Sequence, residues 1–204
     1  MARPTYPRSQ GRHAAAAAEI LARHERMVGG PVTLPVPIEL IIEQTYRLQI
    51  LWEQIAEPPQ TIILGALVPR RRMILLNLRH RGFFERWIGP ERFTLAHELA
   101  HWVYDADNPD QLTLDLGEQP GEQYCYHRDS PGLSEDLHLR EINANKLAAH
   151  LLMPQELVRA ASIDEVLGDL RGTAARWQVS LAALEIRLEE LGLTGNHSPG
   201  RRSL

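Results

Sequence analysis

The pattern of hydrophobic and polar positions along the chain predicts both helices and short strands. Residues 37–46 place apolar side chains three and four positions apart, which predicts a helix. Residues 61–68 and 73–77 are short runs rich in Ile, Leu and Val, and these predict two strands joined by a turn at residues 69–72. Strands near the start of the chain followed by helices indicate an α+β fold with a small antiparallel or mixed sheet.

Helical spacing dominates the second half of the chain. Gly89-Pro90 is a typical helix start and predicts a helix that runs to about residue 104. A second helix is expected at residues 139–153, where Pro154 closes it, and two further helical stretches at 155–171 and 181–191. Residues 105–137 are rich in Asp, Gly and Pro and lack a sustained period, which predicts a long loop with at most short elements.

Length and composition are those of one ordinary globular core. The chain has 204 residues, of which 44% are hydrophobic and 24% charged. We expect an N-terminal extension at 1–30, partly helical or disordered, and a core at 31–154. A C-terminal helical subdomain at 155–193 and a flexible tail at 194–204 would follow.

Net charge, hydropathy and cysteine content indicate which partners and which cellular compartment to expect. The formal net charge of −4 gives no overall attraction to nucleic acid. No apolar run approaches the roughly 18 residues that cross a bilayer, so we expect no membrane association. A single cysteine, Cys125, cannot form an internal disulfide, which favours a reducing cytoplasm.

The predicted helix at 90–104 carries the pattern His97-Glu98-x-x-His101. Histidines four residues apart lie on one helix face, where two imidazoles can bind one metal ion. The pattern alone would occur in about 3% of shuffled chains of this composition. Its position adds weight, because His97, His101, Thr94 and Glu98 form one polar strip on an otherwise apolar helix. Buried polar groups need partners, and a metal site supplies them.

A third ligand is expected from the helix at 139–153, where Glu141 lies in the middle of the apolar face. A carboxylate in this position requires a metal or a cation, and a buried salt bridge to an arginine such as Arg92 is the alternative. Asn145 lies near the same edge and is expected to support a ligand. His150 is expected to project the opposite way, toward solvent.

Two histidines, a glutamate and an open position predict zinc hydrolysis chemistry, with Glu98 as the general base and not a ligand. Candidates for a donor to the oxyanion are His127, His138, Tyr104, Tyr124 and Tyr126. Cys125 is interpreted as an ordinary half-buried thiol. The strand at 73–77 is expected to form a sheet edge to which an extended substrate adds.

With these two helices, the chain resembles the ImmA/IrrE family of metallopeptidases over about residues 31–193. The family's motif helix is matched by Arg92-Phe-Thr-Leu-Ala-His97-Glu98-Leu-Ala-His101, and its second signature by Glu141-Ile-Asn-Ala-Asn-Lys-Leu-Ala-Ala-His-Leu-Leu-Met-Pro154. The resemblance implies a compact zincin-like fold. It also implies that one Zn²⁺, or another divalent ion such as Mn²⁺, is bound by His97, His101 and Glu141.

The resemblance further implies a protein substrate. Members of the family are implicated in cleaving helix-turn-helix repressors and thereby switching on stress-response or mobile-element genes.

The residues themselves leave two alternative functions open. One is a DNA-binding regulator, suggested by the arginines at 70–72 and 79–81 and by a helical segment with Ser180 and Arg187. The other is a metal-dependent sensor without peptidase activity, against which the intact Glu98 argues.

Overall fold

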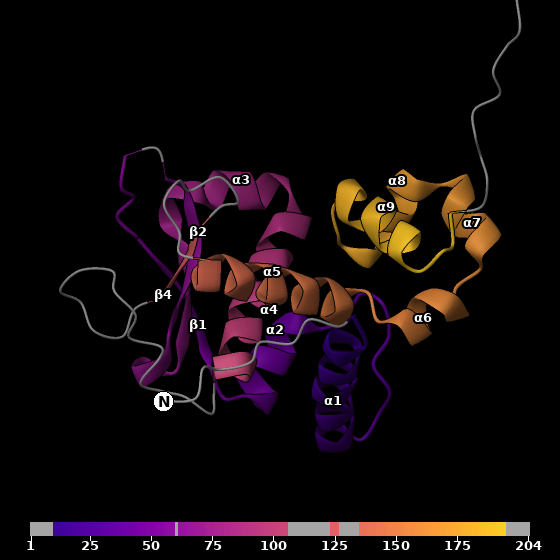
Figure 1. The fold of residues 1–204 in the computed structure, drawn as a ribbon, viewed down its shortest axis with the longest axis horizontal. Helices are drawn as coiled ribbons and strands as arrows, with labels where there is room; N and C mark the ends of the chain where they lie inside the picture. The colour runs from indigo at the N-terminus through magenta and orange to yellow at the C-terminus, as the bar shows by residue number, and fades with distance from the viewer. Residues whose placement is uncertain (1–9, 60, 106–122, 127–134, 195–204) are drawn as a thin grey trace, which may run out of the picture.

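The computed structural model describes residues 10–59, 61–105, 123–126 and 135–194. It shows an α+β fold, as predicted, in which a small mixed sheet lies at one end of the molecule and helices make up the rest (Figure 1). Within this part of the chain, no helix is both long and apolar enough to cross a membrane.

The sheet has the order β1-β3-β2-β4. Its strands are β1 (Gln49–Glu53), β2 (Ile63–Val68), β3 (Met73–Asn77) and β4 (Gln123–Tyr126). The predicted hairpin is confirmed: β2 and β3 pair antiparallel across the 3-10 turn η2 (Pro69–Arg71). The sequence did not predict β1, a five-residue strand whose side chains alternate between exposed and half-buried.

The prediction that residues 73–77 form a sheet edge is wrong. β3 lies inside the sheet, because β1 pairs with it in parallel on the side opposite β2. All five of its residues are buried, as is usual for a central strand. Order along the chain gave no information about this long-range pairing. The edges of the described sheet are β1 and β4.

Two long helices, α4 (Ile88–Asp105) and α5 (Glu135–Leu152), cross in the middle of the molecule (Figure 1). The α4 helix packs against β2 and β3 on one side and against α5 on the other. The short elements η3 (Leu78–His80) and α3 (Arg81–Arg86) connect the sheet to α4. The α5 helix begins before the predicted residue 139, with Glu135 and Asp136 in its first turn, where carboxylates favour a helix start.

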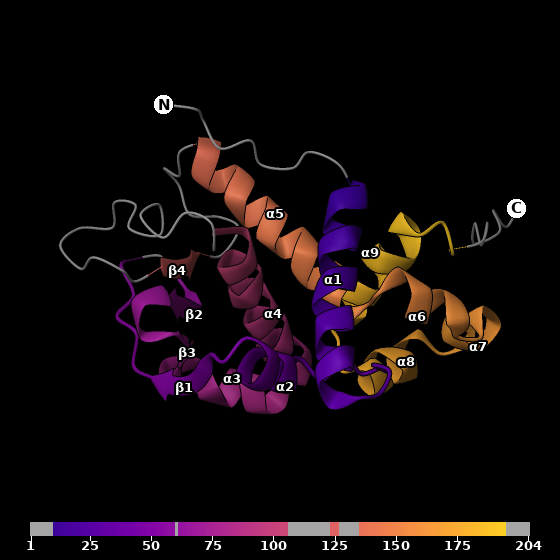
Figure 2. The same ribbon diagram turned by 90° about the horizontal axis from the view of Figure 1, so that it is seen from below.

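The N-terminal helix α1 (Gln10–Val28) lies beside α5 (Figure 2). It contributes Ala17, Ile20 and Leu21 to the same core as the central helices. The predicted helix at 37–46 is present as α2 (Ile38–Leu40) and the π-helical turn η1 (Ile41–Thr45). A boundary near residue 31 stays a prediction, although α1 shares its core with the residues that follow.

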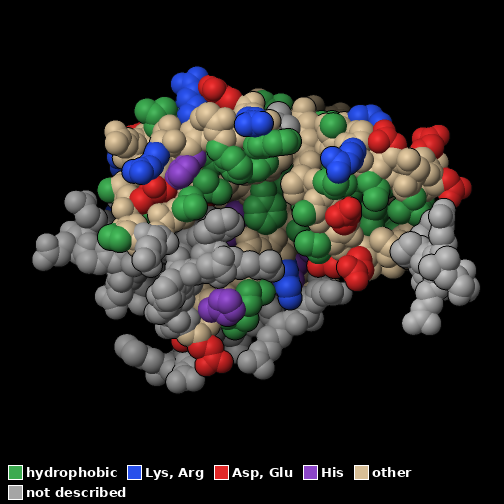
Figure 3. Space-filling model, turned by 90° about the horizontal axis from the view of Figure 1, so that it is seen from above, with side chains coloured by type: hydrophobic (Ala, Val, Ile, Leu, Met, Phe, Trp, Pro, Cys, Tyr) green, Lys and Arg blue, Asp and Glu red, His purple; other side chains and the backbone are tan. Residues whose placement is uncertain are grey.

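The C-terminal helices are α6 (Gln155–Ala160), α7 (Ile163–Gly168), α8 (Leu170–Trp177) and α9 (Leu181–Glu190). The single stretch predicted at 155–171 is therefore broken into short helices. Gly89, at the start of α4, lies against the turn before α9: a Cβ there would be 2.6 Å from the Ser180 nitrogen. Seen from above, hydrophobic side chains gather in a hollow between the half with the sheet and α3 and the half with these helices (Figure 3).

His150 is not directed to solvent as the sequence predicted; it is buried near the end of α5. Its ring nitrogens lie 3.1 and 3.3 Å from the guanidinium of Arg187, on α9. Arg187 is 1% exposed and also donates to the carbonyl of Met153 and to Glu190. The helical wheel failed here because α1 and α9 cover a face of α5 that an isolated helix would expose.

This buried polar contact is sensitive to acid. Burial, reinforced by the charge of Arg187, lowers the pKa of His150 from 6.5 to about 4. Burial also lowers the pKa of His13, whose ring lies 6.2 Å from that of His150. Both imidazoles are therefore neutral in the folded protein at neutral pH. Unfolding restores ordinary pKa values, so the unfolded chain binds more protons below about pH 6.5 and is favoured as the pH falls toward 4.

We predict that His150→Gln makes the folding stability less dependent on pH. Glutamine keeps an acceptor for Arg187 but does not titrate. The wild-type protein should lose up to on the order of 3 kcal/mol more than the variant as the pH falls from 7.5 to 4.5. Urea unfolding of the metal-free proteins measures this difference. His138→Gln, an exposed histidine on the same helix, is the control. Equal pH dependence in all three proteins would contradict the prediction.

Candidate metal centre

The α4 helix places His97 and His101 one turn apart on the face that meets α5. Both are 2% exposed. Their Nε2 atoms are 2.9 Å apart, and their rings are nearly perpendicular, at 72°. The predicted polar strip is confirmed, since Thr94 and Glu98 are buried beside them while Leu95, Ala96 and Leu99 enter the apolar core. A helix that is buried on all sides must give such a strip a polar surrounding.

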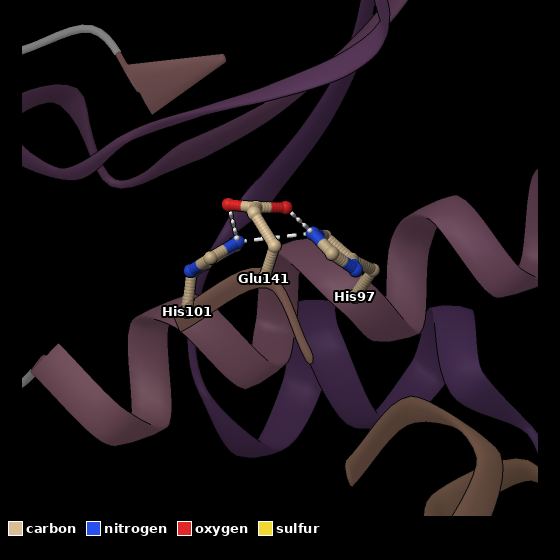
Figure 4. A group of neighbouring side chains, drawn as sticks. All are labelled: His97, His101 and Glu141. Carbon is tan, nitrogen blue, oxygen red and sulfur yellow. Dashed lines mark hydrogen bonds and ion pairs between the residues drawn. The ribbon is translucent and has the colours of Figure 1, made fainter. Parts of the chain in front are cut away.

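Glu141 reaches this pair from α5. Its two carboxylate oxygens lie 3.1 Å from Nε2 of His97 and 3.2 Å from Nε2 of His101, so the carboxylate spans both rings (Figure 4). Ala144 and Ala148, both completely buried on α5, leave room for α4 to approach closely. The side chains from the two helices therefore point toward one common position.

The alternative of a salt bridge between Glu141 and Arg92 is wrong. Arg92 donates to both carboxylate oxygens of Glu39, at 3.0 and 3.1 Å, and to the carbonyl of Val36. It fixes the segment around α2 to the first turns of α4. The carboxylate of Glu141 is left to the two histidines.

The histidines control the charge state of Glu141. Burial by itself raises the pKa of this carboxyl, but hydrogen bonds and charges from His101 and His97 outweigh burial and hold its pKa well below the usual range. Glu141 is therefore ionised at neutral pH. An ionised carboxylate and imidazole nitrogens facing one point are the donors that a divalent cation takes.

The spacing of these atoms fits a metal ion. One ligand atom from each of His97, His101 and Glu141 lies within 4.8 Å of the others. Tetrahedral zinc with bonds of about 2.0–2.1 Å places its ligand atoms about 3.3–3.4 Å apart. The observed separations of 2.9, 3.1 and 3.2 Å lie within about half an ångström of that geometry.

Asn145 supports the first histidine, in the position the sequence suggested. Its Oδ1 lies 2.9 Å from Nδ1 of His97 and accepts the Nδ1 proton. With Nδ1 as the donor to Asn145, the Nε2 atom of His97, which faces Glu141 and His101, is the one that would bind a metal after losing its proton. Asn145 follows Glu141 by one turn of α5, so one face of this helix supplies both groups.

Glu98 lies between α4 and β2 and is completely buried. Its Cγ is 3.7 Å from the point where a Cβ on Gly65 of β2 would lie. Sequence reasoning did not single out Gly65, although an isolated glycine within a strand pattern is a recognised sign of close approach. The ring of Phe93, also on α4, is 6.5 Å from the ring of His97.

Of the other predicted candidates, the structure describes only Tyr104 and His138. The hydroxyl of Tyr104 is 2.6 Å from Nδ1 of His13 on α1, and burial raises the pKa of this tyrosine to about 12. His138 is exposed in the first turns of α5. His127 and the side chains of Tyr124, Cys125 and Tyr126 lie outside the described residues.

Two of the arginines behind the DNA-binding alternative, Arg72 and Arg187, make contacts within the protein. Arg187 is buried, as described above. Arg72 donates to the carbonyl of Tyr46 at 2.5 Å, and its guanidinium carbon lies 5.0 Å from the ring centre of Trp102, next to His101. On α9, Glu185 and Glu189 are exposed where a DNA-reading helix would present cations.

An α+β domain whose central helix carries His-Glu-x-x-His, joined by a glutamate from a later helix, has the architecture of a metallopeptidase. The sequence pattern of the Peptidase_M78 family, described as the IrrE N-terminal-like domain, matches residues 68–189. The chain belongs to this metallopeptidase family, as the resemblance predicted. No curated protein matches it.

We predict that Asn145→Ala weakens zinc binding about 10- to 100-fold, because His97 loses the acceptor that orients it. Competition with a chelator of known zinc affinity measures the change. Asn145→Asp keeps an acceptor at the same position and should retain wild-type affinity or exceed it. Lys146→Ala, an exposed neighbour, is the control. Unchanged affinity in Asn145→Ala would show that the hydrogen bond does not orient a ligand.

Proposed function

We propose that this protein is a zinc-dependent endopeptidase, with His97, His101 and Glu141 as the metal ligands and Glu98 as the general base. The observation that carries the proposal is the convergence of two imidazoles and one carboxylate at 2.9–3.2 Å, next to a glutamate on the same helix. Two histidines and one glutamate form the ligand set of a catalytic zinc site that keeps one position for water or substrate.

The chemistry divides between the metal and the chain. When bound, the metal polarises the scissile carbonyl and lowers the pKa of the attacking water to about 7. Glu98 accepts the proton that this water loses and delivers it to the leaving amine. Its complete burial favours this role, since a carboxylate in a low dielectric is a stronger base than one in water. Asn145 and Glu141 hold the histidines in place.

Membership in the family supports a protein substrate. We propose that the substrate is a regulatory protein such as a helix-turn-helix repressor, and that its cleavage switches on stress-response or mobile-element genes. Such a substrate places the reaction in the cytoplasm. Zn²⁺ is the metal we expect, and Mn²⁺ is the alternative that metal analysis distinguishes.

The competing function is a metal-dependent sensor in which the same ligands only stabilise the fold. Both functions need His97, His101 and Glu141, but only hydrolysis needs Glu98. The Glu98→Gln variant therefore separates them. Glutamine has the same shape as glutamate and cannot accept the proton of the water.

We predict that the wild-type protein and Glu98→Gln each bind about one zinc ion and that only the wild-type protein cleaves helix-turn-helix proteins encoded near its gene. The variant should lose at least about 100-fold in kcat. Elemental analysis and gel-based cleavage with mass spectrometry of the products measure the two properties. A wild-type protein that binds metal without cleaving would favour the sensor.

The ligand assignment has its own test. Glu141→Ala should lose most of its bound metal, because only the two imidazoles remain. Glu135→Ala, an exposed carboxylate in the first turn of the same helix, is the matched control and should keep one metal ion. Full metal occupancy in Glu141→Ala would remove Glu141 from the site.

A further inference from the structure

Gly65 is the point where the sheet comes closest to the polar strip of α4. A Cβ at this position would lie 2.6 Å from Cγ2 of Thr94 and 3.0 Å from the carbonyl oxygen of Leu75. The backbone of Gly65 does not have a positive φ, so its conformation does not require glycine. The missing side chain therefore matters because it lets α4 pack closely against β2.

The backbone of β2 is irregular at the same point. Ile63 pairs with Tyr126 and Ala66 with Tyr124, so two residues of β2 lie opposite one residue of β4. This extra residue is a β-bulge, and bulges beside active sites redirect the strand and its side chains. The bulge and the close contact with α4 are separate observations that meet at Gly65.

Thr94 cannot easily move away from Gly65. Its Oγ1 donates to the carbonyl of Pro90 at 2.9 Å, which fixes the rotamer of this β-branched side chain and holds Cγ2 toward the strand. Thr94 is also only 4% exposed. A side chain at position 65 would have to displace either this rotamer or the helix.

Glu98 lies one turn after Thr94 on the same strip, and its Cγ is 3.7 Å from the same Cβ position. Its side chain thus passes over the bare backbone of Gly65. A methyl group at position 65 would press on Thr94 first and would shift the turn of α4 that carries Glu98. His97 and His101 face α5 instead, where Glu141 and Asn145 hold them.

We propose that Gly65 is a positioning residue that sets the place of the Glu98 carboxylate relative to the metal ligands, through its contact with Thr94. The inference rests on the proposed function, in which Glu98 transfers the proton. Two different elements then position the two parts of the site: α5 orients the metal ligands, and β2 orients Glu98.

The experiment compares Gly65→Ala, Thr94→Ser and the double variant in the full-length chain. Serine keeps the hydroxyl that bonds to Pro90 but removes Cγ2, the atom nearest the added methyl. Gly82→Ala is the control, because a Cβ at Gly82, on α3, meets nothing within 4 Å. The measurements are zinc content, urea unfolding midpoints, and kcat and KM on the repressor protein that wild type cleaves.

Gly65→Ala should keep about one zinc ion and a KM within about twofold of wild type, while kcat falls about 10- to 100-fold, as small misplacements of a reacting group do. Thr94→Ser alone should keep most of its activity. The double variant should recover kcat to within about threefold of Thr94→Ser. This recovery is the result that a general weakening of the fold would not give.

Three results would overturn the inference: wild-type kcat in Gly65→Ala, loss of zinc in proportion to kcat, or no recovery in the double variant. A wild-type protein that binds zinc but cleaves nothing would refute the proposed function and the catalytic part of this inference with it. The contact between Gly65 and Thr94 is then judged by unfolding alone, where the two substitutions should be non-additive in the urea midpoint.

Discussion

The burial of a polar strip on the central helix α4 is the constraint on which the rest of the structure depends. Two histidines, a glutamate and a threonine are enclosed between the sheet and α5 with almost no exposure. Leaving such groups without partners would cost several kcal/mol. The surrounding elements therefore have to supply polar partners at fixed positions while still packing closely. Glu141 and Asn145 from α5 meet this demand on one side.

The two sides of the strip are built differently. On the side facing α5 the contacts are polar: a carboxylate and an amide lie within hydrogen-bonding distance of the imidazoles. On the side facing the sheet the contacts are van der Waals contacts, and the missing side chain of Gly65 lets α4 lie close to β2. A peptidase needs both properties at once: ligands that hold a cation and a base that is fixed without being bound to it.

Elements at both ends of the described chain support the central helices. His13 on α1 bonds to Tyr104 at the end of α4, and Arg187 on α9 bonds to His150 and to the carbonyl of Met153 at the end of α5. A cation at a helix C-terminus is favoured by the free carbonyl groups there. The N-terminal and C-terminal helices thus contact the metallopeptidase core through buried polar groups, which fix orientation more specifically than apolar packing does.

The local features of this protein could be predicted from its sequence. The spacing of His97 and His101 and the apolar face that carries Glu141 follow from the helical period of 3.6. The hairpin of residues 61–77 follows from two short apolar runs with a turn between them, and short segments carry both signals without distant partners. Long-range contacts set the remaining features. They place β3 inside the sheet, bury His150 under α9 and bring Gly65 against Thr94. Each of these depends on segments far apart in the chain, and no local period records which distant element will cover a given face.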